Sequence, residues 1–263
     1  MWSVGISVSP CEDAARIGYD DRQINRIVIR VAQYFLDRNM CVIFGHDWRE
    51  DGVMRAIANF ACIVAAGAKD SDETMSRFRS RDKEQGEESR MLNVVPTGRN
   101  SLSRVALEAQ EEAGGVLEVM TAKEAIEQLA KPMSESSRLY PAALNGDERA
   151  AELTALRYCI TALLNPGCRV CLGGKTRGYQ GSEPGVLEEA RLALECGKPL
   201  YLLGGFGGAT RLFGKKDKYG RLHYWRIDNG LAGKEKKELF ETTDIARALS
   251  LISIGINKTT EGM

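Results

Sequence analysis

The chain has 263 residues and a formal net charge of zero, from 36 basic and 36 acidic side chains, and 43% of its residues are hydrophobic. This length and composition are typical of an ordinary globular protein with one large α/β domain. The lack of a basic excess disfavours binding to a nucleic-acid backbone.

The cysteine content and the hydropathy pattern of the chain indicate its cellular compartment. The seven cysteines are an odd number scattered through hydrophobic segments, which does not fit a disulfide framework. Residues 1–6 lack the charged and apolar regions of a signal peptide. No apolar run approaches the roughly 20 residues that cross a bilayer. We therefore expect a cytoplasmic protein with no membrane partner.

Strand and helix patterns alternate through the first part of the chain. An apolar run at residues 4–8 predicts a strand that ends in a polar loop, and residues 40–44 predict a second strand stopped by Gly45. Apolar residues at helical spacing predict helices over residues 20–38 and 53–66. Apolar strands that alternate with helices are typical of a parallel sheet covered on both faces.

Residues 69–90 interrupt this alternation. They are rich in charge and serine and hold few apolar residues, which predicts a surface excursion. The pattern then resumes with strands at residues 92–95 and 116–119, a helix around residues 102–112, and a helix that ends at Ala130.

The second half carries the clearest pattern. Residues 147–164 predict a long amphipathic helix with Asp147 as a candidate N-cap. Strands follow at residues 169–172 and 199–203, with a helix between them at residues 184–196 and a last helix at residues 244–252. The expected fold is α/β and Rossmann-like, an open and mostly parallel sheet with helices on both faces, in a single domain over residues 1–263.

Two consecutive predicted strands end in glycine pairs, Gly173-Gly174 and Gly204-Gly205. Glycine lets the backbone turn sharply and lets a ligand approach main-chain N–H groups. Such loops converge at the carboxyl edge of a parallel sheet, where the N-terminus of a following helix favours an anion such as phosphate. Together with Gly45, these pairs predict a ligand crevice at that edge.

Two basic residues are candidates to neutralise a phosphate: Lys175 in the first glycine loop and Arg157 on the preceding predicted helix. Lys175 follows the glycine pair directly and is either a phosphate ligand or a solvated loop lysine, and the two interpretations are evenly balanced. Arg157 falls near Leu153 and Ile160 on the apolar side of its helix, which indicates a partly buried guanidinium with a partner. The segment is not a Walker A loop, because its glycines, lysine and hydroxyl lack the required spacing.

Two acidic residues, Glu188 and Glu189, lie in the first turn of the helix that Pro184 and Gly185 begin. The helix dipole alone stabilises acidic residues there. Because the two are consecutive, they point about 100° apart and only one faces the crevice easily. Such a carboxylate would accept hydrogen bonds from ribose hydroxyls or act in N-glycosidic bond cleavage. The choice between the two glutamates stays open.

Two patterns resemble metal or redox sites without completing one. Cys168 and Cys171 have the spacing of such sites, but they lie on a predicted strand, so we expect buried structural thiols. His46 and His223, the two histidines, are far apart in the sequence and form no ligand pair. We therefore predict neither a metal nor a cofactor.

Residues 173–189 (GGKTRGYQGSEPGVLEE) and 198–208 (KPLYLLGGFGG) resemble the SLOG superfamily. Residues 4–9 (VGISVS) and 44–47 (FGHD) are similar to the first and second strand ends of the same group. SLOG proteins are Rossmann-like and include the LOG phosphoribohydrolases, the nucleotide-sensing modules of TRPM channels and the sensor domains of Thoeris antiphage effectors. The resemblance is clearest over residues 1–213, which leaves residues 214–263 as a C-terminal extension expected to pack on the domain.

The sequence looks closest to the sensor-like branch. LOG hydrolases carry a Pro-Gly-Gly-x-Gly-Thr loop before the catalytic glutamate, whereas the loop here begins Gly-Gly-Lys and is longer. The resemblance to the Thoeris sensors implies that Arg157, Lys175 and either Glu188 or Glu189 bind an ADP-ribose-like or cyclic ADP-ribose-like ligand. It also implies a role in signalling or antiphage defence, with output through a homo-oligomer or a separate effector protein.

Two alternatives remain. One is a LOG-type nucleotide N-glycosidase with Glu188 and Glu189 as candidate catalytic residues, and the other is a subunit with a vestigial crevice that contacts a partner protein through residues 69–90. The residues predicted to bind the ligand lie at the strand ends, in the glycine loops and on the two helices. They are Gly5, Ser7, Ser9, Gly45, Asp47, Arg157, Gly173, Gly174, Lys175, Pro184, Gly185, Glu188, Glu189, Gly204, Gly205 and Gly207.

Overall fold

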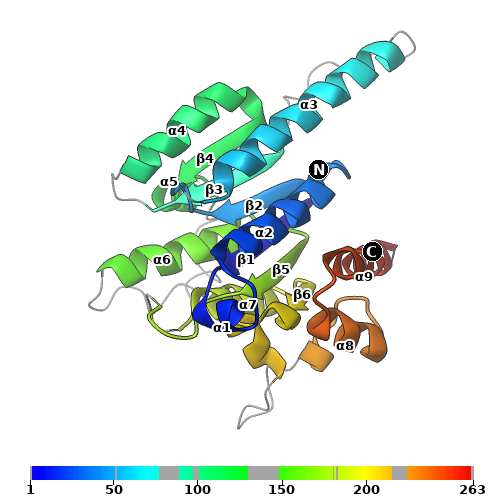
Figure 1. Cartoon of the computed structure of the whole chain (residues 1–263). Helices are drawn as coiled ribbons and strands as arrows, with labels where there is room; N and C mark the ends of the chain where they lie inside the picture. The colour runs from blue at the N-terminus through cyan, green and yellow to red at the C-terminus, as the bar shows by residue number, and fades with distance from the viewer. Residues whose placement is uncertain are drawn as a thin grey trace.

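The computed structural model describes residues 2–50, 52–76, 89–96, 101–129, 148–179, 181, 183–214 and 224–261. Within these ranges six strands form one parallel sheet in the order β4-β3-β2-β1-β5-β6 (Figure 1). The predicted Rossmann-like α/β fold is therefore confirmed. The strands are β1 (Ser3–Ser9), β2 (Cys41–Gly45), β3 (Met91–Val95), β4 (Leu117–Thr121), β5 (Cys168–Gly173) and β6 (Leu200–Leu203).

Helices cover both faces of the sheet. One face lies under α2, α3, α4 and α9, the other lies under α5, α6 and α7, and α8 packs beside β6 (Figure 1). No helix in the described ranges is both long and apolar enough to span a bilayer. The helices are α1 (Glu12–Arg16), α2 (Asp21–Leu36), α3 (Met54–Ser76), α4 (Ser101–Ala113), α5 (Ala122–Leu129), α6 (Glu148–Tyr158), α7 (Gly185–Glu195), α8 (Gly233–Glu241) and α9 (Ile245–Glu261).

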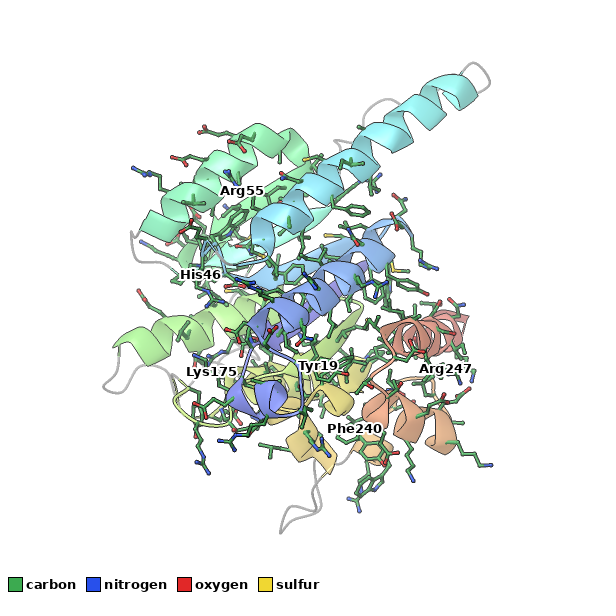
Figure 2. All side chains as sticks on the ribbon, in the orientation of Figure 1. Tyr19, His46, Arg55, Lys175, Phe240 and Arg247 are labelled. Carbon is green, nitrogen blue, oxygen red and sulfur yellow. The ribbon has the colours of Figure 1, made fainter. Side chains whose placement is uncertain are left out.

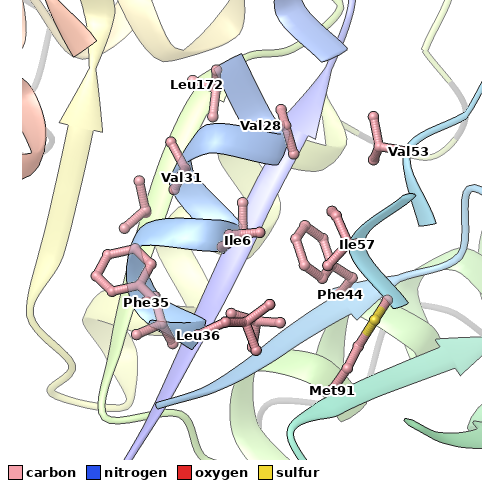
Figure 3. Packing of buried hydrophobic residues seen from close by; sticks show 14 of the residues in the cluster. Ile6, Val28, Val31, Phe35, Leu36, Phe44, Val53, Ile57, Met91 and Leu172 are labelled. Carbon is pink, nitrogen blue, oxygen red and sulfur yellow. The ribbon is translucent and has the colours of Figure 1, made fainter. Parts of the chain in front are cut away.

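The largest core cluster lies between the sheet and the helices on the α2 side of it. Asp20 caps α2 because its carboxylate accepts the N–H of Gln23, while the Gln23 side chain accepts the N–H of Asp20. Apolar residues of α2 at three- and four-residue spacing then face β1, β2 and β5 (Figure 3). The α2 residues buried there are Ile24, Val28, Val31, Ala32, Phe35 and Leu36.

The structure corrects two element predictions near the N-terminus. The short helix α1 occupies the segment after β1 that is expected to be a polar loop. Helix α3 continues from Met54 to Ser76, past the expected end at residue 66, so the predicted surface excursion at residues 69–90 begins as helix. Residues 68–76 contain neither glycine nor proline, and charged residues are tolerated within a helix. Residues 77–88 of that excursion lie outside the described residues.

The second half needs three further corrections. Helix α6 ends at Tyr158, and a π-helical turn (Cys159–Leu163) takes the place of its expected last turn, closed by a hydrogen bond from the Leu164 N–H to the Cys159 carbonyl. Helix α9 extends to Glu261, beyond the expected residue 252, and α8 has no predicted counterpart. Asp147, the candidate N-cap, lies outside the described residues.

Two isoleucines of α3 offer a matched test of this packing. Ile57 is fully buried against the sheet, whereas Ile63 on the same helix is 67% exposed. We expect Ile57→Ala to lower the free energy of unfolding by about 2–5 kcal/mol, because it leaves a cavity in the core. Ile63→Ala should change it by less than about 0.5 kcal/mol. Urea denaturation measures both, and equal effects would contradict the packing of α3.

Candidate functional site

The candidate site lies where β1 and β5 end side by side. These strands pair in register from Val4 opposite Cys168 to Ser9 opposite Gly173, and the strand order reverses between them. In parallel sheets a crevice opens at the carboxyl edge at such a point. Figure 2 shows His46 and Lys175, which follow β2 and β5, at this end of the molecule.

The first glycine pair shapes the turn that leaves β5. Gly173 and Gly174 have φ angles of +63° and +94°, which side chains with a Cβ rarely adopt. The Gly174 N–H donates to the carbonyl of Ser9 at 2.8 Å, and the Gly174 carbonyl accepts the N–H of Ala209 at 2.8 Å. Farther along the loop, Thr176 donates to the Asp13 carboxylate at 2.7 Å. The loop is thus tied to β1, to α1 and to the segment after β6.

A cavity of about 300 Å³ opens between the end of β1, helix α6, this loop and the start of α7. Its volume lies at the lower end of the range for small-molecule sites. Polar and apolar side chains both face it. Its lining comprises Val8, Ser9, Leu153, Arg157, Lys175, Gly178, Tyr179, Gly185, Val186 and Glu189.

Arg157 and Glu188 form a buried ion pair at one wall of this cavity. The Arg157 Nη1 donates to the Glu188 Oε2, and the two residues are only 9% and 3% exposed. This confirms the predicted partner for the guanidinium. Gly185 provides the space, because a Cβ at that position would lie 2.7 Å from the Arg157 Nη2. Removing one partner of such a pair would leave a buried charge uncompensated.

Glu189 belongs to a second, partly buried ion pair, with the fully buried Arg169 of β5. The Arg169 Nη1 donates to the Glu189 Oε2 at 2.8 Å and to the Ser7 Oγ at 2.7 Å. Ser7 in turn donates to the same Glu189 Oε2 at 2.5 Å. Sequence reasoning missed Arg169, although an arginine near the start of an otherwise apolar strand signals a buried charge that needs a partner.

The two glutamates therefore have different environments. Glu188 turns toward α6 and its carboxylate is almost fully buried, whereas Glu189 lines the cavity. Both hydrogen bonds from Ser7 and Arg169 reach Glu189 Oε2, and no described residue donates to its Oε1. Lys175 is exposed at the cavity, and no ion pair joins it to another residue in the described ranges. The cavity thus offers a cation and a carboxylate oxygen to a ligand.

The second glycine pair lies against protein. A Cβ at Gly204 would meet the Phe240 ring at 2.5 Å, and a Cβ at Gly205 would lie 2.4 Å from the Thr242 carbonyl oxygen. Gly207, at a φ of +79°, lies against α1. These glycines allow α1, α8 and the residue after α8 to approach the segment that follows β6 closely.

Three predicted residues at other positions also contact protein. Gly45, at the end of β2, lies against Leu156 of α6, and Asp47 pairs with Arg49 at 2.6 Å. Pro184 is the N-cap of α7, and its carbonyl accepts the N–H groups of Leu187 and Glu188. None of these three residues belongs to the described lining of the cavity.

The cysteine pair of β5 is buried, as the sequence predicts. Cys168 and Cys171 are fully buried free thiols, and burial raises the pKa of both, for Cys171 to about 12. Among the described residues no group of three or more His, Cys, Asp or Glu is placed to hold a metal ion. His223 lies outside the described residues.

Comparison with known proteins gives one match. A family model described as SLOG cluster2 matches residues 1–216, most of the chain. Neither the curated proteins nor the solved structures contain a significant match.

The buried thiols predict a loss of stability at alkaline pH. Burial raises the pKa of Cys159 and Cys171 to about 12 in the folded protein, whereas unfolded thiols titrate near pH 8.5. Above that pH the unfolded state loses protons that the folded state retains, so the free energy of unfolding falls. We expect about 1.4 kcal/mol of loss for each such thiol between pH 7.5 and 9.5. Urea denaturation at both pH values measures this loss. In Cys171→Ala the loss between the two pH values should be smaller by about 1.4 kcal/mol, the contribution of one thiol.

Proposed function

Because this chain belongs to the SLOG family, we propose that it binds a nucleotide-derived small molecule in the cavity between β1, α6 and α7. The observation that carries this proposal is the charge arrangement of the lining. Arg157 is already paired with Glu188, while Lys175 has no ion pair with a described residue and Glu189 has an open oxygen. The cavity therefore suits a ligand that carries both an anion and hydroxyl groups.

The phosphate groups of the ligand would lie at Lys175 and the N-terminus of α7. The first N–H groups of an α-helix have no acceptor within the helix, and Gly185 and Val186 hold these positions in α7 and line the cavity. The helix dipole adds to the attraction of an anion there. The Lys175 ammonium supplies a full positive charge beside these amides.

The sugar and the base would occupy the rest of the cavity. Glu189 Oε1 would accept a hydrogen bond from a ribose hydroxyl. Tyr179 is 39% exposed, and with Leu153 and Val186 it supplies apolar surface on which a base can pack. An ADP-ribose-like or cyclic ADP-ribose-like ligand contains all of these groups.

Sensing without turnover is the favoured role. Both Glu188 and Glu189 are engaged in ion pairs, and the loop after β5 lacks the Pro-Gly-Gly-x-Gly-Thr sequence of the LOG hydrolases. The assignment to the Thoeris-like sensor branch, the place in signalling or antiphage defence, and the output through a homo-oligomer or an effector protein rest on the sequence resemblance.

Lys175 provides the first test of this function. We expect Lys175→Ala to weaken the binding of ADP-ribose by about tenfold or more, because a charge-assisted contact contributes about 1.5–3 kcal/mol. Isothermal titration calorimetry measures the change in Kd. Lys237→Ala, an exposed lysine of α8, is the matched control and should bind as the wild type does. Unchanged affinity in Lys175→Ala would remove the proposed phosphate contact.

A ligand panel separates sensing from hydrolysis. ADP-ribose, its cyclic isomers and nucleoside monophosphates are each added to the wild type, and the melting temperature is recorded before chromatography of the recovered ligand. A ligand at 100 times its Kd adds about 2.7 kcal/mol of stability, which raises the melting temperature by several degrees. We expect the stabilising ligand to be recovered intact. Release of free base would instead favour the N-glycosidase, with Glu188 and Glu189 as the first residues to replace.

A further inference from the structure

Arg169 is a fully buried arginine in the strand next to β1, and the ligand contacts proposed above do not include it. It lies opposite Gly5 in the register of β1 and β5, on the face of the sheet that α6 and α7 cover. A buried guanidinium is costly unless it is paired and hydrogen-bonded. Because Arg169 contacts Glu189, which lines the cavity, we ask what it contributes to ligand binding.

We propose that Arg169 is a positioning residue that fixes the Glu189 carboxylate so that Oε1 is presented to a hydroxyl group of the ligand. This inference rests on the proposed nucleotide-binding function, in which Glu189 accepts a hydrogen bond from a ribose hydroxyl. Arg169 itself does not belong to the described lining of the cavity.

The hydrogen-bond directions in this cluster follow from its chemistry. Arginine has only donors, so Ser7 Oγ must accept from the Arg169 Nη1. The single proton of the Ser7 hydroxyl is then available for the Glu189 Oε2, at 2.5 Å. Arg169 donates to the same Oε2 at 2.8 Å. Two donors thus fix one carboxylate oxygen, and the remaining oxygen is left for the ligand.

The backbone around Arg169 is shaped to hold the guanidinium. Its Nη2 donates to the carbonyl of Ile160 at 2.5 Å, within the π-helical turn that ends the α6 segment. A Cβ at Gly5 would lie 2.7 Å from the Arg169 Nη2 and 2.8 Å from its Cζ, so only glycine leaves the room that the guanidinium occupies. Gly5 and Ser7, predicted from the sequence as ligand residues, act through Arg169 in this proposal.

The fixed Glu189 carboxylate determines which chemical group of a ligand can bind on this side of the cavity. A carboxylate fixed by Arg169 and Ser7 accepts hydrogen bonds and repels anions. A phosphate would therefore be directed toward Lys175, and a hydroxyl donor, such as those of ribose, toward Glu189. Arg169 would fix the orientation of the ligand without contacting it.

Gly5→Ala tests this role because it displaces the guanidinium and keeps every charge. Calorimetry with two probes, ADP-ribose and inorganic pyrophosphate, separates the hydroxyl contact from the phosphate contact. We expect Gly5→Ala to weaken ADP-ribose binding by about tenfold and to leave pyrophosphate binding unchanged. Gly67→Ala, where a Cβ would meet nothing within 4 Å, is the matched control and should bind both probes as the wild type does.

An equal loss for both probes in Gly5→Ala, or no loss for either, would overturn the positioning role. Wild-type protein that binds pyrophosphate and ADP-ribose equally well would also overturn it, because the ribose hydroxyls would then add nothing. Wild-type protein that binds neither probe would instead refute the proposed function itself.

A measurement without ligand tests the contact between Arg169 and Glu189 independently of the proposed ligand-binding function. We compare the melting temperatures of Arg169→Met, Glu189→Met and the double variant with that of the wild type. We expect the double variant to melt above Arg169→Met alone, since the single change leaves the Glu189 carboxylate uncompensated. Additive losses, or a double variant that melts below both single variants, would show that Arg169 does not hold Glu189. If Arg169→Met fails to fold while the double variant folds, the coupling is supported.

Discussion

The site depends on compensating the charges of two consecutive glutamates, Glu188, which is buried, and Glu189, which is partly buried at the cavity. Glu188 and Glu189 point to different sides of α7, so one arginine cannot serve both. Arg157 reaches Glu188 from α6, and Arg169 reaches Glu189 from β5. Because an unpaired buried charge costs several kcal/mol, these two pairs fix α7 against both neighbouring elements. The walls of the cavity are thereby set before any ligand arrives.

Charge compensation also determines what the cavity can recognise. The charges of the paired arginines and glutamates compensate one another. Within the described lining, the ammonium of Lys175, the first amides of α7 and one carboxylate oxygen of Glu189 stay available to a ligand. An anion is therefore favoured at one end and a hydrogen-bond donor at the other. This polarity, together with the apolar surface of Tyr179, supports the proposal that the ligand is a phosphorylated sugar nucleotide.

Much of this could be predicted from the sequence, because apolar strands that end in glycine loops place the crevice in any parallel sheet. The partner of Arg157 could also be expected from its position on an apolar helix face. The role of Arg169 could not be predicted in the same way, because its contact with Ser7 joins residues 162 positions apart in the sequence and depends on the pairing of β1 with β5. Gly204 and Gly205 could be recognised in the sequence, but their role could not. Glycine after a strand signals close approach, and only the structure reveals that Phe240 and Thr242 are what approaches.

The most direct test is an experimental structure of the protein with ADP-ribose. The account predicts phosphate oxygens within hydrogen-bonding distance of the Lys175 Nζ and the Gly185 and Val186 amides, with a ribose hydroxyl on Glu189 Oε1. Both the Arg157–Glu188 and the Arg169–Glu189 pairs should persist in that complex. A ligand bound outside the cavity, or one that takes Arg169 or Arg157 away from its glutamate, would contradict the account.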